Sequence, residues 1–162
     1  MAHARRLEAL VKDIGERPGP AAGPGNILEK KGALPRPAPG QVAGTFGKHK
    51  HPRFPTYTVR SGIVIDAPDG TAVACIEAGR VVFADWFTGY GKLVIVDHGD
   101  KVYSLYARVD ELEVKVGDVV AAGQVIARVA DPGGADVRGL YFEIRRGAQA
   151  VDPLGWLSRR SP

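Results

Sequence analysis

The sequence has one cysteine and no long apolar run in 162 residues. A single thiol cannot form a bridge within the chain, so an internal disulfide framework is excluded. No stretch of 18 apolar residues occurs, which predicts no membrane-spanning helix. The first fifteen residues are charged and lack the apolar centre of a signal peptide, so two origins stay open: a cytoplasmic protein, or a mature form or fragment of an exported one. Cys75 has apolar neighbours, which predicts a buried, unreactive side chain.

Acidic residues are scarce in the first third of the chain. Residues 1–60 contain eleven Lys and Arg against four Asp and Glu, a net charge of +7, whereas residues 61–162 have a net charge of −3. No nucleic-acid-binding motif accompanies the basic part, so we interpret it as a solvated tail rather than a nucleic-acid site. Attraction between opposite charges would favour folding of the segment before residue 41 back over the acidic remainder, across the partner-binding groove that is predicted below.

An apolar stripe at helical spacing predicts a short helix over residues 4–17. Its members are Leu7, Leu10, Val11 and Ile14. A helix of under four turns is marginal alone, so it needs a partner, such as a coiled-coil partner, or is the end of a longer helix. The Pro- and Gly-rich composition that follows predicts a linker. The organisation expected is therefore a helical segment (1–17), a linker (18–40) and one β-domain (41–160).

Helical patterns are absent after residue 41, where short apolar segments alternate with turn residues. The predicted strands are 56–60, 62–66, 71–76, 79–85, 92–97, 102–107, 125–130 and 139–146. Many short strands predict an all-β fold, an antiparallel sandwich or a partly open barrel. The basic segment 48–55 is predicted to be a loop with solvated histidines. Residues 151–157 are predicted to form a turn that packs an indole on the sheet.

The strand predicted at 139–146 presents two different faces. The alternating sets are Leu140, Phe142 and Ile144 on one side, and Tyr141, Glu143 and Arg145 on the other. The apolar set is expected to enter the core. The polar set is expected to lie on a surface that binds a partner.

Six motifs follow one another in a fixed order between residues 41 and 158. They are Gly-Ile-Val-Ile-Asp-Ala-Pro-Asp-Gly-Thr-Ala-Val (62–73), Ala-Gly-Arg-Val-Val-Phe-Ala-Asp-Trp (78–86), Gly-Tyr-Gly-Lys-Leu-Val-Ile-Val-Asp-His-Gly (89–99), Tyr-Ser-Leu-Tyr-Ala (103–107), Val-Gly-Asp-Val-Val-Ala-Ala-Gly-Gln-Val-Ile-Ala (116–127) and Leu-Tyr-Phe-Glu-Ile-Arg-Arg (140–146). In this order they resemble the LytM domain of lysostaphin-like zinc endopeptidases, which cut peptide crosslinks in bacterial peptidoglycan.

The resemblance implies a zinc site whose positions have changed in this chain. The family's three ligands, two His and one Asp, fall on Arg60, Val64 and Tyr141, and its proton-handling histidines fall on Arg108 and Gly139. Arginine has no lone pair to donate, valine has no donor atom, and a phenol beside a guanidinium is a poor zinc ligand. The prediction is a chain with no zinc site, no cofactor and no catalysis. His98, in a His-Gly turn, is expected to be structural.

LytM domains without zinc ligands occur in the EnvC-type murein hydrolase activators, which bind N-acetylmuramoyl-L-alanine amidases and switch them on. The chain shares their Ala-Asp-Trp (84–86), Gly-Tyr-Gly (89–91), Ser-Leu-Tyr (104–106) and 140–146 motifs. The resemblance implies that a partner-binding groove replaces the active site. Its predicted residues are Arg60, Ser61, Tyr90, Tyr106, Arg108, Tyr141, Glu143 and Arg145. Tyrosine and arginine are typical of interface hot spots.

Three functions follow as hypotheses. The first is a non-catalytic activator of an amidase, located in the periplasm or cell envelope by resemblance. The second is a non-catalytic peptidoglycan-binding module. The third is an active hydrolase with relocated metal ligands, which the loss of all three ligands disfavours.

Overall fold

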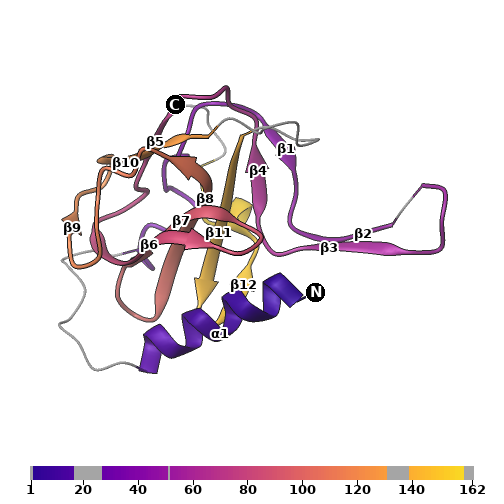
Figure 1. Ribbon diagram of the computed structural model, residues 1–162, viewed down its shortest axis with the longest axis horizontal. Helices are drawn as coiled ribbons and strands as arrows, with labels where there is room; N and C mark the ends of the chain where they lie inside the picture. Colours follow the sequence, from indigo (N-terminus) through magenta and orange to yellow (C-terminus); the bar gives the residue numbers. More distant parts are fainter. Residues whose placement is uncertain (1, 17–26, 51, 131–138, 159–162) are drawn as a thin grey trace.

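One ten-stranded, mostly antiparallel sheet organises the computed structural model, which describes residues 2–16, 27–50, 52–130 and 139–158 (Figure 1). The helix α1 is Ala2–Glu16, and the strands are β1 (Val42–Gly44), β2 (Gly47–Lys50), β3 (Tyr57–Arg60), β4 (Ile63–Ile65), β5 (Ala72–Ala74), β6 (Gly79–Phe87), β7 (Gly91–Asp97), β8 (Val102–Asp110), β9 (Val119–Val120), β10 (Val125–Val129), β11 (Leu140–Arg146) and β12 (Gln149–Val151). A 3-10 turn, η1, spans Pro153–Gly155. The first part of the predicted linker (18–26) and His51 lie outside the described residues.

The all-β prediction is confirmed, and each of the eight predicted strands has a counterpart. The sheet order is β1-β4-β11-β8-β7-β6-β9, with β12 added beside β11 and with β10 paired to β5 and β8, and it does not close into a barrel. The prediction of a loop over 48–55 is wrong at its start. Residues 47–50 form β2, which pairs only with β3 in a separate two-stranded hairpin that projects from the domain in Figure 1. This segment has no apolar pattern, so pairing with β3 is what makes it a strand.

One face of the sheet carries the main hydrophobic core. Tyr106, Phe142 and Ile144 are fully buried there. The second part of the predicted linker, residues 27–40, is called the strap here and also contributes, since Ile27, Leu34 and Ala38 are buried in the same cluster as Trp156 and Leu157. Leu34 forms a parallel bridge with Leu157. The part of the expected linker from residue 27 onward is therefore folded against the domain, and the prediction for the C-terminal indole is confirmed.

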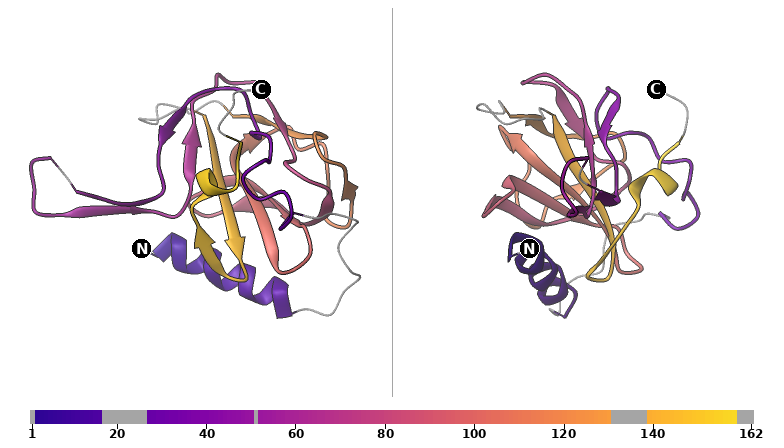
Figure 2. Two further views of the ribbon diagram at one scale, coloured as in Figure 1. Left: turned by 180° about the vertical axis from the view of Figure 1, so that it is seen from behind. Right: turned by 90° about the vertical axis from the view of Figure 1, so that its right-hand side faces the viewer.

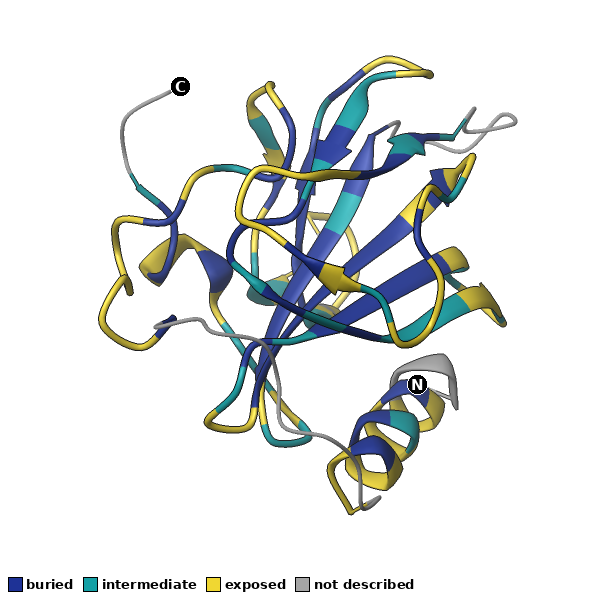
Figure 3. Ribbon diagram, turned by 90° about the vertical axis from the view of Figure 1, so that its left-hand side faces the viewer, coloured by how far each residue is buried: buried dark blue, intermediate teal, exposed yellow. Residues whose placement is uncertain are grey.

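The opposite face of the sheet is covered by α1. Leu7, Val11 and Ile14 of the predicted stripe are buried against Leu93, Ile95, Tyr103 and Leu105 of β7 and β8. Figure 2 shows the sheet between α1 on one side and the strap with η1 on the other, and Figure 3 shows the buried positions of α1 near the strands. The predicted partner of the helix is thus its own sheet, through apolar contact rather than charge. In the described residues no helix is long and apolar enough to cross a bilayer.

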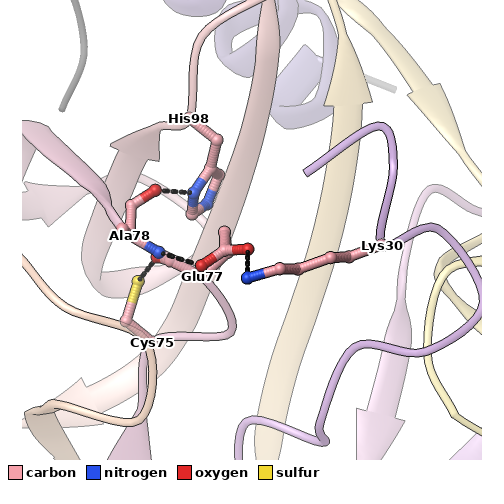
Figure 4. Close-up of polar contacts among 5 residues, drawn as sticks. All are labelled: Lys30, Cys75, Glu77, Ala78 and His98. Atoms are coloured by element: carbon pink, nitrogen blue, oxygen red, sulfur yellow. Dashed lines mark hydrogen bonds and ion pairs between the residues drawn. The ribbon is translucent and has the colours of Figure 1, made fainter. Parts of the chain in front are cut away.

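A buried polar network connects β5, β7 and β8. The His98 ring contacts the Ala78 carbonyl through Nδ1 (2.9 Å) and Ser104 Oγ through Nε2 (2.6 Å), and Ser104 Oγ donates to Tyr106 Oη (2.8 Å). Cys75 is fully buried, and its Sγ donates to the Glu77 carbonyl (Figure 4). His98 is 1 % exposed, and burial lowers the pKa of its ring. Cys75 is buried, as predicted. His98 contacts Ala78 and Ser104 within the fold, as expected for a structural residue.

Glu77 links this network to the strap. Its Oε1 accepts from the Ala78 N–H (2.8 Å), and its Oε2 lies 2.6 Å from Lys30 Nζ (Figure 4). Burial acts to raise the pKa of this carboxyl, but the hydrogen bonds from Lys30 and Ala78 outweigh it and hold the pKa below its usual value. The ion pair therefore stabilises the attachment of the strap above the carboxyl's ordinary pKa of 4.5.

Lys30→Met is expected to lower the free energy of unfolding at pH 7 by about 1–3 kcal/mol, because it leaves the buried Glu77 carboxylate without its cation. A depressed pKa gives stability that is present above the unfolded value and is lost as pH falls through the folded value. The difference between variant and parent should therefore shrink below pH 4.5. Urea unfolding at several pH values measures it, with Lys115→Met as the exposed control. Equal stability of both variants at pH 7 would contradict a stabilising role of the Lys30–Glu77 ion pair.

Candidate functional site

The α1 face of the sheet contains a chain of polar contacts on β11. Tyr141 Oη donates to Glu143 Oε2 (2.6 Å), and Arg145 Nε donates to Glu143 Oε1 (2.7 Å). Arg145 Nη1 also donates to the Ala148 carbonyl (2.6 Å) in the turn to β12. The alternation of β11 placed these three side chains together as the sequence predicted. The expectation that all three lie at an open surface is wrong, because Glu143 is 0 % and Arg145 3 % exposed.

Close packing explains the burial of this pair. Gly62, just before β4, lies so near that a Cβ there would be 2.4 Å from the Phe142 carbonyl oxygen and 2.7 Å from Glu143 Cγ. Burial raises the pKa of Glu143, against the opposing effects of Arg145 and of the Tyr141 hydroxyl. Burial and the nearby carboxylate of Glu143 raise the pKa of Tyr141 as well. An ionised Glu143 therefore depends on Arg145, which makes this pair a structural element of the site.

An aromatic cluster adjoins the Tyr141 end of this row of polar contacts on β11. The rings of Tyr90 and Tyr141 are 5.8 Å apart, and the guanidinium of Arg108 lies 5.7 Å from the centre of the Tyr141 ring. Burial and the Glu143 carboxylate raise the pKa of Tyr90 to about 12, so its hydroxyl stays protonated. Both tyrosines are half-buried and Arg108 is exposed. The structure thus brings together three of the predicted groove residues.

A pocket lies at the Arg145 end of the row of polar contacts on β11. Its volume is about 680 Å³, and it is lined by Arg60 at the end of β3, by Ser61 just after it, by Arg145, and by residues of the β2–β3 hairpin. Arg60 Nη1 donates to the Thr45 carbonyl (3.2 Å). Arg60 and Ser61 therefore line the same pocket as Arg145, which in turn contacts Glu143.

Tyr106 does not belong to this face, and its assignment to the groove is wrong. In the register of β8 and β11, Tyr106 pairs with Phe142, whereas Ala107 pairs with Tyr141. Side chains alternate along a strand, so Tyr106 points into the core on the other face. It is 0 % exposed, and its hydroxyl accepts from the Ile76 N–H (3.1 Å). The motif resemblance placed it in the groove, and alternation within a strand could not exclude it, because Tyr106 and Tyr141 lie on different strands whose register only the structure gives.

The positions onto which the resemblance maps the family's zinc ligands hold Arg60, Val64 and Tyr141. Val64 pairs with Tyr141 across β4 and β11 and is buried, and Arg60 lines the neighbouring pocket. Among the described residues, no group of three or more His, Cys, Asp or Glu could hold a metal ion. The arrangement offers hydrogen-bond donors, aromatic rings and positive charge, which suit recognition of a partner.

Sequence reasoning missed two cations of the site, and it attributed a cover over the groove to charge attraction rather than to the apolar stripe of α1. Lys48 and Arg146 also line the pocket, together with Glu8 of α1. Lys48 was assigned to a loop, and its place depends on the β2–β3 pairing. The stripe of α1 did signal a packed helix, but nothing local indicated that it packs on the face of Tyr90 and Tyr141, which share its cluster.

Comparison with known proteins agrees with this geometry. Residues 58–153 match the model of peptidase family M23. The murein hydrolase activator EnvC of Escherichia coli is 51% identical over 98 residues, which are 60% of this chain and 23% of that protein. The murein hydrolase activator NlpD of the same species is 37% identical over 125 residues, 76% of this chain and 31% of that protein. The chain spans less than a third of the length of these two relatives.

Solved structures share the fold. The catalytic domain of the antimicrobial peptidase lysostaphin from Staphylococcus simulans superimposes with a TM-score of 0.62 at 24% identity, covering 70% of this chain and 89% of that domain. These two sequence relatives are thus named activators, while this structural relative is named a peptidase. The ordered motifs, the antiparallel sheet and the family match over residues 58–153 lead to one conclusion: the chain belongs to peptidase family M23 and contains a LytM domain.

Proposed function

We propose that this protein is a non-catalytic regulator that binds an N-acetylmuramoyl-L-alanine amidase of the cell envelope and switches it on. The observation that carries the proposal is the replacement of the zinc ligands by Arg60, Val64 and Tyr141 on a preserved LytM sheet. A guanidinium, an isopropyl group and a phenol bonded to Glu143 cannot activate a water molecule as bound zinc does. The similarity to EnvC and NlpD, both named murein hydrolase activators, supports an enzyme partner.

The surface offered to the amidase would run from the Tyr90–Tyr141–Arg108 cluster toward the Arg60 pocket. Tyrosine rings provide a large contact area with little loss of side-chain freedom, and arginine provides directed hydrogen bonds. Activation requires only that the bound surface fits the open state of the amidase better than its closed state. The helix α1 lies on the same face, so we infer that it limits access to part of this surface.

The test is dye release from labelled murein. The chain alone should release no dye, the amidase alone little, and the mixture several times more than the amidase alone. The purified chain should contain no stoichiometric zinc, measured by elemental analysis. About one zinc per chain, together with chelator-sensitive release by the chain alone, would show a peptidase instead. Retention of the chain on murein without any effect on the amidase would favour the peptidoglycan-binding module.

A further inference from the structure

The pocket beside Arg145 carries an excess of positive charge. Lys48, Arg60, Arg145 and Arg146 line it, and Glu8 is the one carboxylate among the described lining residues. The charge of Arg145 is compensated by Glu143 at 2.7 Å. Within the described part of the chain, the other three cations form no ion pair. The pocket therefore presents three uncompensated cations against one carboxylate on α1.

The donors of these cations are only partly used by the protein. Arg60 donates through Nη1 to the Thr45 carbonyl at 3.2 Å, and a guanidinium has five N–H donors. Lys48 Nζ lies 4.1 Å from the centre of the Tyr57 ring. This cation–π contact positions the ammonium group, and its N–H donors are not bound to a carboxylate of the described residues. The pocket is thus preorganised for an anion.

The pocket continues into one face of the β2–β3 hairpin. Lys48 pairs with Val59 and Lys50 pairs with Tyr57, so these four side chains share a face. Val59 is 60 % and Tyr57 55 % exposed. Basic and apolar side chains therefore alternate on a surface that leads away from the domain. A complementary ligand carries carboxylates and apolar side chains in turn.

We propose that the pocket and the hairpin face bind an acidic, partly apolar segment of a partner protein. Carboxylates of the segment pair with Lys48, Arg60 and Arg146, and its apolar side chains contact Val59 and Tyr57. Peptidoglycan stem peptides also carry carboxylates, but their small side chains leave the two exposed apolar residues of the hairpin uncovered. The inference deepens the proposed function, because it names the chemistry of the segment by which an amidase would be held.

The probe is a fluorescent peptide, acetyl-Glu-Leu-Glu-Leu-Glu-amide, titrated with the full chain by anisotropy at low salt. Its glutamine counterpart and a soluble disaccharide–tetrapeptide from murein are titrated in parallel by competition. We expect the acidic peptide to bind roughly tenfold or more tightly than the glutamine peptide, and added salt to weaken its binding. Equal affinity of the two peptides overturns the proposal. Displacement of the labelled acidic peptide by the muropeptide at lower concentrations than by the unlabelled acidic peptide overturns it as well.

Variants locate the binding. Lys48→Gln, Arg60→Gln and Arg146→Gln together should weaken binding of the acidic peptide roughly tenfold or more. Lys115→Gln should not, because Lys115 is exposed and does not line the pocket. Circular dichroism checks that both variants are folded, and Arg146→Gln alone, at an exposed position, gives a second reading. Undiminished binding to the folded triple variant overturns the proposal. The titration contains no amidase, so peptide binding without amidase activation would count against the proposed function alone.

Discussion

Arg145→Ala is expected to lower the free energy of unfolding by about 3–5 kcal/mol, because it leaves a buried carboxylate without its cation. Glu143 is 0 % exposed and accepts from Arg145 Nε at 2.7 Å. The same substitution removes the donor to the Ala148 carbonyl, which holds the turn between β11 and β12. Thermal and urea unfolding measure the loss. Amidase activation should fall as well, since the Tyr141 hydroxyl depends on the position of Glu143.

The loss of stability in Arg145→Ala should depend on pH, in a direction that follows from the pKa of Glu143. Burial already raises the pKa of Glu143, and removal of Arg145 would raise it further. A raised pKa in the folded state gives stability that is present below the unfolded value, here 4.5, and is lost as pH rises. The deficit of Arg145→Ala should therefore be smallest below pH 4.5 and largest at neutral pH.

A matched double variant separates the lost charge from the lost volume. In Glu143→Gln/Arg145→Met both charges are removed, and the glutamine can still accept from the Tyr141 hydroxyl. Most of the stability should return at pH 7, and the dependence on pH should disappear. A double variant as unstable as Arg145→Ala would show that packing, rather than an uncompensated carboxylate, accounts for the loss. A single variant as stable as the parent would show that the pair contributes nothing.

Removal of α1 is expected to strengthen amidase binding roughly 10–100-fold, the effect of a coupling of about 1–3 kcal/mol. Leu7, Val11 and Ile14 pack on the face that holds Tyr90 and Tyr141, so under the proposed function the amidase and α1 would compete for part of one surface. The deletion should end before residue 27, because Ile27 belongs to the main core and Lys30 pairs with Glu77. Surface plasmon resonance with immobilised amidase measures the affinity, at low protein concentration because the deletion exposes Leu93 and Ile95.

Point variants test the same idea in the full chain. Val11→Glu places a charge at a position that is 1 % exposed and should release α1, whereas Ala9→Glu adds the same charge at an exposed position of the same helix. Only Val11→Glu should approach the affinity of the truncated chain. If neither the truncation nor Val11→Glu binds better than Ala9→Glu, α1 is a structural cover and the amidase contacts another surface.

Several features of this protein follow from the sequence by itself. Alternation in 139–146 placed Tyr141, Glu143 and Arg145 on one side of a strand, and the structure confirms their contacts. The apolar stripe over residues 4–17 predicted a helix that requires a partner, and α1 is buried along that stripe. The side chains at positions 60, 64 and 141 argue against a zinc site without any coordinates. These conclusions depend on local periodicity and on the chemistry of single side chains, which neighbouring residues encode.

Other features depend on contacts between residues far apart in the chain. Only the register of β8 against β11 showed that Tyr106 faces the core and Ala107 the site. The packing of α1 on β7 and β8 covers that face of the sheet, and the close approach of Gly62 to Glu143 helps to make Glu143 and Arg145 an internal ion pair. The cationic pocket likewise required the β2–β3 pairing, which carries Lys48 toward Arg60 and Arg146. Sequence alternation says which side chains share a face, whereas the burial of that face depends on the segment that packs against it.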